Sequence, residues 1–368
     1  MATEQALFDA VRDAHADNAH PDEAHADKSR ADKSRGSEFA GLLGQVRSAG
    51  LLKRRPGYYA VKIASTVIAL GAGVAAFILL GDSWWQLAVA VYLAVVFAQL
   101  GFIGHDAGHG QIRHGARANA VIGVIHANAM VGLSYGWWVD KHNRHHAHPN
   151  EPDRDPDVDA GALAFTLQAA AGRHGLGRVL VRYQAWYFLP LLLLQAVSLH
   201  VNSVSWLIRQ HRVRRTEAAL LAIHGVVYVT ALLLVLSPLK ALAFAAVHQG
   251  LLGVYLGCAF APNHKGMPTP TGRDAASFLR RQVLSSRDVR RGWLVDWALG
   301  GLNYQIEHHL FPSMPRPNLK RAQPVVRAYC ARIGLPYSEC SLLDSYRQAL
   351  QHLDAMGAIG SRPVGEES

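Results

Sequence analysis

The sequence predicts an all-α integral membrane protein. Half of its 368 residues are hydrophobic and only 17% are charged, whereas soluble domains carry about 25% charged residues. Its three cysteines exclude a disulfide framework and a metal site built on paired cysteines. Five apolar stretches approach the ~20 residues that a helix needs to cross a hydrocarbon core. They lie at about 58–80, 84–104, 183–207, 218–236 and 240–260.

Four of these stretches are expected to be transmembrane helices arranged as two hairpins. The first two stretches are separated only by 81–83 and the last two only by 237–239, so each pair predicts a tight helical hairpin. The middle stretch, 183–207, contains Pro190 and His200 and is better suited to an interfacial or buried helix. The fold class is therefore about four crossings, with interfacial helices and a cytoplasmic helical cap.

Composition divides the chain into three parts. Residues 1–37 are polar and repeat ADKSR, which predicts a disordered tail. Residues 38–346 contain the apolar stretches and form the membrane domain, and 347–368 are expected to be a C-terminal tail. At 38–52 the apolar residues have helical spacing, which predicts a short helix lying on the membrane surface.

The distribution of charge predicts the orientation in the membrane. The net charge of +10 arises largely from basic residues in the long loops and near the termini, while the hairpin tips carry almost none. By the positive-inside rule, both termini and the long loops are cytoplasmic. An apolar chain with basic loops fits a lipid bilayer as partner and not nucleic acid. The abundance of Ala, Gly, Arg and Val favours a bacterial inner membrane.

Three histidine clusters lie at the ends of the crossings. In a helix, positions i, i+3 and i+4 share one face, so each cluster can direct its side chains at a metal ion. Together they exceed the ligands of one tetrahedral zinc site and suffice for two metal ions, although imidazole alone does not distinguish iron, copper, zinc and nickel. Counting crossings brings all three clusters to one membrane face. They are His105 and His109; His142, His145 and His146; and Gln305, His308 and His309.

The clusters HDAGH, HNRHH and QIEHH resemble those of the membrane fatty acid desaturases. The resemblance extends roughly from Phe39 to Tyr346. Gln305 at the start of the third cluster, and its surroundings NYQIEHHLFP, are similar to the front-end branch, which inserts a double bond between an existing one and the carboxyl end. The resemblance implies an oxidoreductase that desaturates a fatty acyl chain, linked to CoA or a lipid, using O₂, two electrons and two iron ions.

The resemblance also implies which residues bind iron. The expected ligands lie in the three clusters, with one more histidine just after the fourth crossing. Gln305 either binds the metal through its side-chain oxygen, or lies next to a ligand and contacts it or a water. Nearby polar residues are candidates to orient the imidazole N–H groups. The implied ligands are His105, His109, His142, His145, His146, His264, His308 and His309, and the orienting candidates are Asp106, Asn143, Asp155, Asp157, Asn303 and Glu307.

No haem-binding HPGG and no GxGxxG dinucleotide loop occur in the chain. A separate electron donor, a ferredoxin or a flavin reductase, is therefore expected. A run of arginines before the third cluster either docks an acidic carrier or an acyl-CoA phosphate, or is an ordinary basic loop. It comprises Arg273, Arg280, Arg281, Arg287, Arg290 and Arg291.

Two alternatives remain open from the sequence. One is a fatty acyl or sphingolipid hydroxylase or desaturase with the same metal centre, and the other is a non-catalytic membrane metal carrier, which would need ligands along its crossings. Isolated histidines in the apolar stretches are expected to have hydrogen-bonded packing roles, and His148 is expected not to be a ligand. The isolated histidines are His126, His200, His224 and His248.

Overall fold

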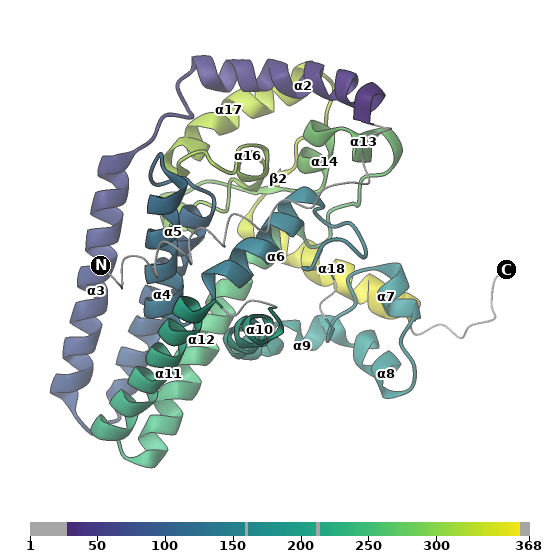
Figure 1. The fold of residues 1–368 in the computed structure, drawn as a ribbon. Coiled ribbons are helices and arrows are strands. Elements are labelled where there is room, and N and C mark those ends of the chain that lie inside the picture. Colours follow the sequence, from purple (N-terminus) through teal and green to yellow (C-terminus); the bar gives the residue numbers. More distant parts are fainter. Residues whose placement is uncertain (1–27, 159–160, 211–213, 361–368) are drawn as a thin grey trace.

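The computed structural model describes residues 28–158, 161–210 and 214–360, which are mainly helical (Figure 1). One short parallel strand pair, β1 (Asp288–Val289) with β2 (Glu339–Cys340), occurs in the described part of the chain. The helices are α2 (Lys28–Ser48), α3 (Pro56–Leu80), α4 (Gln86–Gly108), α5 (Ala116–Val124), the π-helix η1 (Ile125–Val131), α6 (Tyr135–Ala147), α7 (Leu167–Ala171), α8 (Leu176–Arg182), α9 (Gln184–Leu191), the 3₁₀-helix η2 (Leu192–Leu194), α10 (Gln195–Arg209), α11 (Arg215–Val235), α12 (Pro238–His264), α13 (Gly272–Ala276), α14 (Phe278–Leu284), α15 (Trp293–Ala298), α16 (Gln305–Leu310), α17 (Arg316–Arg332) and α18 (Leu342–Gly360).

The two expected hairpins are present as α3–α4 and α11–α12 (Figure 1). Their tips meet at the same end of the bundle, where the Asp82 carboxylate accepts the Ser237 N–H at 2.8 Å and pairs with Lys240 at 3.0 Å. The one cation expected near the tips is thus neutralised. The antiparallel course places the last turns of α4 and α12 together at the opposite end.

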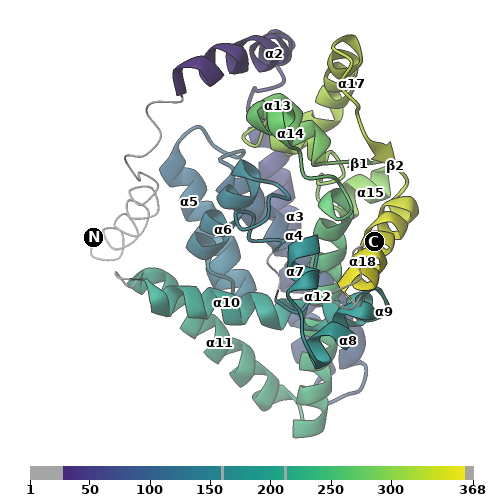
Figure 2. The same cartoon turned by 90° about the vertical axis from the view of Figure 1, so that its right-hand side faces the viewer.

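The middle apolar stretch does not form a straight crossing. Five helical segments of the described chain are long and apolar enough to span a bilayer, and Gln184–Arg209 is one of them. It is nevertheless divided into α9, η2 and α10. The helix α10 is seen end-on in Figure 1 and runs across the hairpins in Figure 2. This arrangement agrees with the interfacial or buried helix that the sequence predicts.

A glycine on α12 permits this crossing. A Cβ atom at Gly253 would lie 2.4 Å from the Leu192 carbonyl oxygen and 2.9 Å from the Ala196 nitrogen, which are backbone atoms that cannot move aside independently. Gly71 on α3 is also helical, but a Cβ there would meet nothing within 4 Å. The close approach of α12 to η2 and α10 therefore depends on Gly253.

We predict that Gly253→Ala destabilises the protein by about 1–3 kcal/mol, the usual range for overpacking. The matched control Gly71→Ala is expected to be neutral or to stabilise by up to about 1 kcal/mol, because alanine has the higher helix propensity. The melting temperatures of the detergent-solubilised variants are compared, with the loss of folded protein on heating monitored by size-exclusion chromatography. Equal melting temperatures would show that the backbones are not in tight contact.

The outer helices expose apolar side chains, as expected for contact with lipid. Leu79 on α3 and Leu234 on α11 are 84% and 80% exposed, whereas the most apolar part of α4 is 67% buried within the protein. Exposed apolar surface of this extent is unfavourable in water and favourable in a bilayer. The chain is an integral membrane protein.

Polar side chains within the bundle are hydrogen-bonded, as predicted for the isolated histidines. His200 and His224 donate Nδ1–H to the carbonyls of Gly132 and Ala129, at the end of the π-helix η1, over 2.8 and 3.0 Å. The remaining two contacts are His126 Nδ1 with the Ile122 carbonyl at 2.8 Å and His248 Nδ1 with the Tyr228 hydroxyl at 3.0 Å.

The helices α4 and α12 end at the same end of the bundle, which we call the cap end. A group of shorter helices, the cap, covers it. Its core is formed by apolar residues of α2, α14, α16 and α17, including the fully buried Leu42, Ile306 and Val326. The helix α2 begins at Lys28, within the segment expected to be a tail; residues 1–27 lie outside the described residues. These helices close over the last turns of α4 and α12.

The expected C-terminal tail is wrong over most of its length. α18 extends from Leu342 to Gly360 and contacts α7, α8, α9 and α12. Its Ala349 and Leu353 are fully buried, because the helix has one apolar face and an apolar surface to cover. The packed domain therefore continues through α18.

Candidate metal centre

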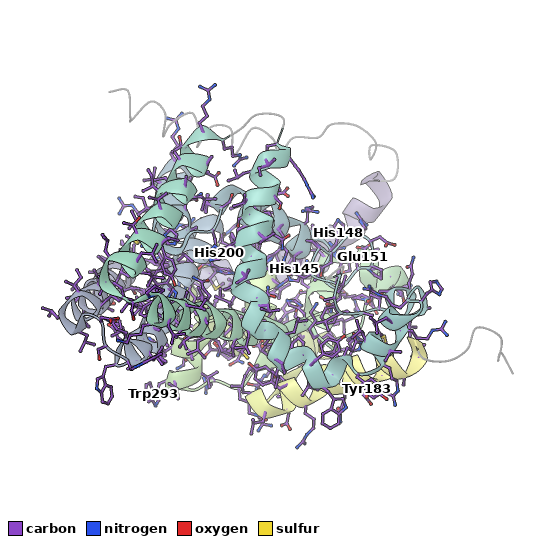
Figure 3. All side chains as sticks on the ribbon, turned by 90° about the horizontal axis from the view of Figure 1, so that it is seen from below. His145, His148, Glu151, Tyr183, His200 and Trp293 are labelled. Atoms are coloured by element: carbon purple, nitrogen blue, oxygen red, sulfur yellow. The ribbon has the colours of Figure 1, made fainter. Side chains whose placement is uncertain are left out.

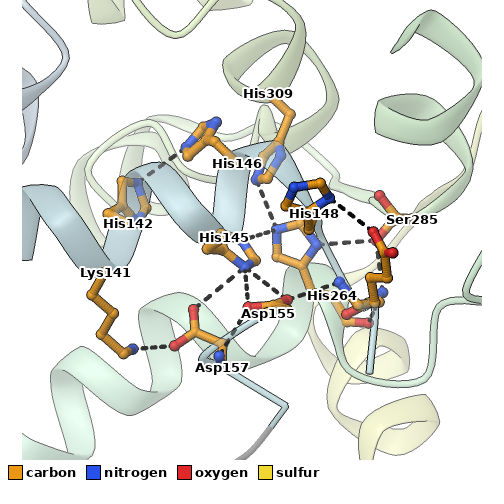
Figure 4. Close-up of polar contacts among 12 residues, drawn as sticks. Lys141, His142, His145, His146, His148, Asp155, Asp157, His264, Ser285 and His309 are labelled. Carbon is orange, nitrogen blue, oxygen red and sulfur yellow. Dashed lines mark hydrogen bonds and ion pairs between the residues drawn. The ribbon is translucent and has the colours of Figure 1, made fainter. Parts of the chain in front are cut away.

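All eight histidines named as expected ligands meet at the cap end of the bundle. They come from segments far apart in the sequence: the end of α4, one face of α6, the last residue of α12, and α16. The i, i+3 and i+4 spacing on α6 and the paired histidines on α16 direct the side chains toward the same space (Figure 4). Seven of the eight side chains form two groups, and His146 lies between them.

The first group contains His105, His109, His142 and His308, whose ligand atoms lie within 4.8 Å of one another. The Nε2 atoms of three of them, His105, His109 and His308, are buried and have no hydrogen-bond partner in the described part of the chain. Unpartnered buried polar atoms are costly. Here the unused nitrogen atoms point toward a common space.

The second group contains His145, His264 and His309. The Nδ1 atom of each faces a group that accepts a hydrogen bond: the Asp155 carboxylate at 3.0 Å, the Ser285 carbonyl at 3.0 Å, and the Gln282 side-chain oxygen at 2.9 Å, respectively. Nδ1 therefore carries the proton in all three rings, and each Nε2 has a lone pair, which in His264 also faces the Gln305 side-chain nitrogen at 2.8 Å.

The three lone pairs of the second group face one another (Figure 4). His264 Nε2 lies 3.0 Å from His309 Nε2 and 3.3 Å from His145 Nε2. Unprotonated nitrogens at this distance repel each other unless a cation lies between them. Two nitrogens bound at right angles to one ion at ~2.1 Å would be about 3.0 Å apart. The residues present thus fit a metal ion.

His146 lies between the two groups. Its ring stacks on His309 with centroids 4.1 Å apart, and its Nε2 is 3.1 Å from His142 Nε2. Burial holds the pKa of His109, His142, His146, His308 and His309 well below the usual value. The rings are neutral at pH 7, the form that binds metals.

Three of the predicted orienting carboxylates contact a histidine. Asp155 and Asp157 lie 3.0 and 3.5 Å from His145 Nδ1, and Asp106 lies 3.3 Å from His105 Nδ1. Asp155 also accepts the backbone N–H groups of Asn150 and Asp157. The pKa of Asp155 is lowered despite its burial, because these donors and His145 stabilise the carboxylate.

We predict that Asp155→Asn weakens metal binding about 10–100-fold, the usual cost of losing a partner behind a ligand histidine. The asparagine amide removes the charge and can present an N–H to His145 Nδ1. The matched control is Asp153→Asn in the same loop, where the carboxylate is exposed and φ is +64°, a conformation that asparagine tolerates. Anaerobic titration with Fe²⁺ compares the affinities, and equal values for both variants would contradict the orienting role.

Four other predictions about individual residues can be compared with the structure. Asn143 lies exposed on the outer face of α6, and Asn303 donates to Asp296 at 2.9 Å, so the orienting role expected for both is wrong. His148 pairs with Glu151 at 2.8 Å, away from both groups. His148 and Glu151 are labelled side by side in Figure 3.

Glu307 is the fourth case, and its carboxyl group faces away from the imidazoles. It lies 2.9 Å from the Tyr337 hydroxyl, which is also 2.6 Å from Asp288. Burial and the neighbouring Asp288 charge raise the pKa of Glu307 well above its usual value. Through Tyr337, Glu307 connects α16 to Asp288 of β1, which is a structural role.

Gln305 lies beside the second group. Its side-chain nitrogen is 2.8 Å from His264 Nε2, and its oxygen accepts from Asn263 at 3.3 Å. The side chain is 5% exposed. Its position next to a free lone pair agrees with both interpretations made from the sequence, a ligand or a close neighbour.

The sequence did not indicate which residues surround the second group and hydrogen-bond to its histidines or to the neighbouring backbone. Gln282 accepts from His309 and donates to the His146 carbonyl at 2.8 Å. Asn150, with φ at +61°, donates to the Ser285 carbonyl at 3.1 Å and the His264 carbonyl at 3.3 Å. Single Gln and Asn residues in polar loops carry no sequence signal for such a role.

The expected basic docking run is not one surface. Arg287 is fully buried, and Arg280 is paired with Glu38 and Asp274. Arg273, Arg290 and Arg291 are exposed. The single patch expected from the sequence is wrong, because α14 and β1 turn the intervening side chains inward.

The bundle, its lipid-facing surface and the two histidine groups define an integral membrane protein with side chains that could hold metal ions at one end. The family model "Fatty acid desaturase" matches residues 82–341. The chain belongs to the fatty acid desaturase family, whose members are oxidoreductases of lipid metabolism.

Three relatives show the range of this similarity. The chain is 32% identical to an acyl-lipid (9-3)-desaturase of Physcomitrium patens over 82% of its length, 29% identical to the Delta(6)-fatty-acid desaturase fat-3 of Caenorhabditis elegans over 86%, and 31% identical to a Delta(8)-fatty-acid desaturase of Euglena gracilis over 82%. It spans 59% of the Physcomitrium protein and 74% of each of the other two.

Proposed function

We propose that the chain is a membrane acyl desaturase with front-end regioselectivity. It removes two hydrogens from adjacent methylenes of a fatty acyl chain, while O₂ accepts these together with two external electrons and two protons to form two waters. The observation that carries the proposal is the convergence of eight buried or partly buried histidines, seven of them in two groups whose ligand atoms lie within 4.8 Å of one another.

In this proposal, two iron ions are held by the two groups. His105, His109, His142 and His308 hold the first, and His145, His264 and His309 hold the second, with His146 between them. Gln305 is a further ligand or neighbour. Bound iron supplies the activation of O₂ that an unactivated methylene requires. Neutral imidazoles leave such a centre electrophilic, and the cap shields it from water.

The protein's own residues control the geometry of the reaction. Asp155, Gln282 and the Ser285 carbonyl fix the ring orientation of the second group. The apolar surroundings of the cap and the adjoining helices determine which carbon of the acyl chain approaches the histidines. The names of the relatives favour a front-end position and leave the carrier, CoA or an intact lipid, to be determined.

The electrons come from a separate donor, a ferredoxin or a flavin reductase. The centre and both termini are assigned to the cytoplasm, because cationic residues concentrate at the cap end and the only cation near the tips, Lys240, is paired with Asp82. The composition favours a bacterial inner membrane, although the relatives described above are eukaryotic.

A desaturase-null host that expresses this chain, grown with and without polyunsaturated precursors, tests the proposal. A new double bond on the carboxyl side of an existing one is the expected product. A product heavier by one oxygen would instead identify a hydroxylase. Unchanged lipids together with a purified chain that binds no iron would overturn the metal centre.

The metal-carrier alternative predicts ligands along the crossings. The two histidine groups lie at the helix ends and in the cap, and the four histidines within the bundle use Nδ1 in hydrogen bonds. A flux of Fe²⁺ into sealed vesicles without any acyl oxidation would favour a carrier.

A further inference from the structure

A buried ion pair lies directly behind the first histidine of the metal centre. The guanidinium of Arg316, the first residue of α17, is 2.8 Å from the Asp106 carboxylate on α4, and the two side chains are 7% and 2% exposed. The other oxygen of the same carboxylate lies 3.3 Å from His105 Nδ1. A chain of contacts therefore connects α17 of the cap, through Asp106 on α4, to the predicted ligand His105.

Two further groups fix this pair in position. The same guanidinium nitrogen donates to the Phe102 carbonyl at 2.7 Å, one turn before Asp106. The hydroxyl of Tyr59 on α3 lies 3.1 Å from the carboxylate and accepts the Arg316 backbone N–H at 3.2 Å. The Asp106 carboxylate is thus held from α3 and α17 at once, close to where these helices meet the end of α4 (Figure 1).

The pairing decides which nitrogen of His105 is free. Arg316 holds one oxygen of the Asp106 carboxylate, so that the other oxygen faces His105 Nδ1 and can accept its proton in a hydrogen bond. His105 Nε2 is buried and has no partner in the described part of the chain. The free lone pair then faces His109, His142 and His308.

We propose that Arg316 is a positioning residue for the metal centre, and that it acts through Asp106 on the ring orientation and tautomer of His105. The inference rests on the proposed function, because it requires the first histidine group to bind a metal ion. Tyr59 supports the same carboxylate from the other side.

A purely structural ion pair would behave differently when both charges are removed. Removing one partner leaves an uncompensated buried charge and destabilises strongly, whereas removing both charges leaves no unpaired charge in the interior. The double variant Arg316→Gln/Asp106→Asn therefore separates stability from positioning, because the fold is restored while the carboxylate behind His105 is still absent.

The test measures Fe²⁺ bound per full-length chain, by anaerobic titration and elemental analysis, together with thermal stability. We expect Arg316→Gln to be destabilised and the double variant to regain stability. Both are expected to bind the ion of the first group about 10–100-fold more weakly, while the ion of the second group is retained. Arg316→Lys, which keeps the charge, should recover part of the affinity.

The matched control is Arg327→Gln on the same helix, which breaks the pair with Glu339 and touches no histidine. It should bind iron like the wild type. If the double variant or a folded Arg316→Gln binds two ions with wild-type affinity, the positioning role is wrong and the proposed function stands. If the wild-type chain binds no Fe²⁺, the proposed function and this inference both fail.

Discussion

Replacement of His309 by alanine is expected to abolish desaturation and to remove the metal ion of the second histidine group. The His309 lone pair faces His264 at 3.0 Å, and the ring stacks on His146, so no neighbouring side chain can replace it. Loss of a residue that only hydrogen-bonds to a ligand histidine usually lowers metal affinity or activity about 10–100-fold. Loss of the ligand itself should therefore lower activity more than about 100-fold. Replacement of His308 should act in the same way on the first group.

Two measurements separate this effect from unfolding. Product analysis in the desaturase-null host gives the activity, and elemental analysis of the purified chain gives the iron content, which should fall from two ions toward one. His148→Ala is the matched control, since this histidine pairs with Glu151 outside both groups. Full activity and iron content in His309→Ala would refute the assignment of the site.

Substitution of Arg287 by leucine is expected to cause a large loss of stability. Its Nε donates to the Pro262 carbonyl at 2.6 Å, and its other nitrogens contact the Lys265 carbonyl and Gln348. These carbonyls end α12, where the helix dipole favours a cation. Losing charged hydrogen bonds and leaving their buried acceptors unpaired costs about 3 kcal/mol or more.

The consequence reaches the metal centre, because His264 is the last residue of α12. Thermal unfolding in detergent should show a decrease of roughly 4 °C or more for a chain of this size, with weaker binding of the second ion. Arg290→Leu serves as the control, since Arg290 is exposed nearby and a surface change should stay within about 0.5 kcal/mol. Similar melting temperatures for the two variants would show that Arg287 is not a buried cap.

The sequence was sufficient for the features that depend on local spacing. The apolar stretches predict α3, α4, α11 and α12 because a bilayer imposes a minimum length on any helix that crosses it. The histidine spacing predicts one ligand face on α6, because i, i+3 and i+4 coincide in a helix. Counting the crossings placed the three clusters at one end of the bundle.

Contacts between distant segments could not be predicted in this way. Gln282 and Asn150 hold His309 and His264, yet nothing near them in the sequence indicates a metal site. Glu307 follows the pattern of an orienting carboxylate, but the turn of α16 directs it toward Tyr337. Arg287 belongs to a basic run in the sequence and lies fully buried in the fold.

The sequence by itself determined that this protein spans a membrane, and it predicted that three histidine clusters lie at one face, because helix length and helical periodicity are local properties. The tertiary structure decided how the histidines divide into two groups, which nitrogen of each ring is free, and which buried side chains hold them. Those features depend on hydrogen bonds between segments that only folding brings together, such as His145 with Asp155 and Asp106 with Arg316.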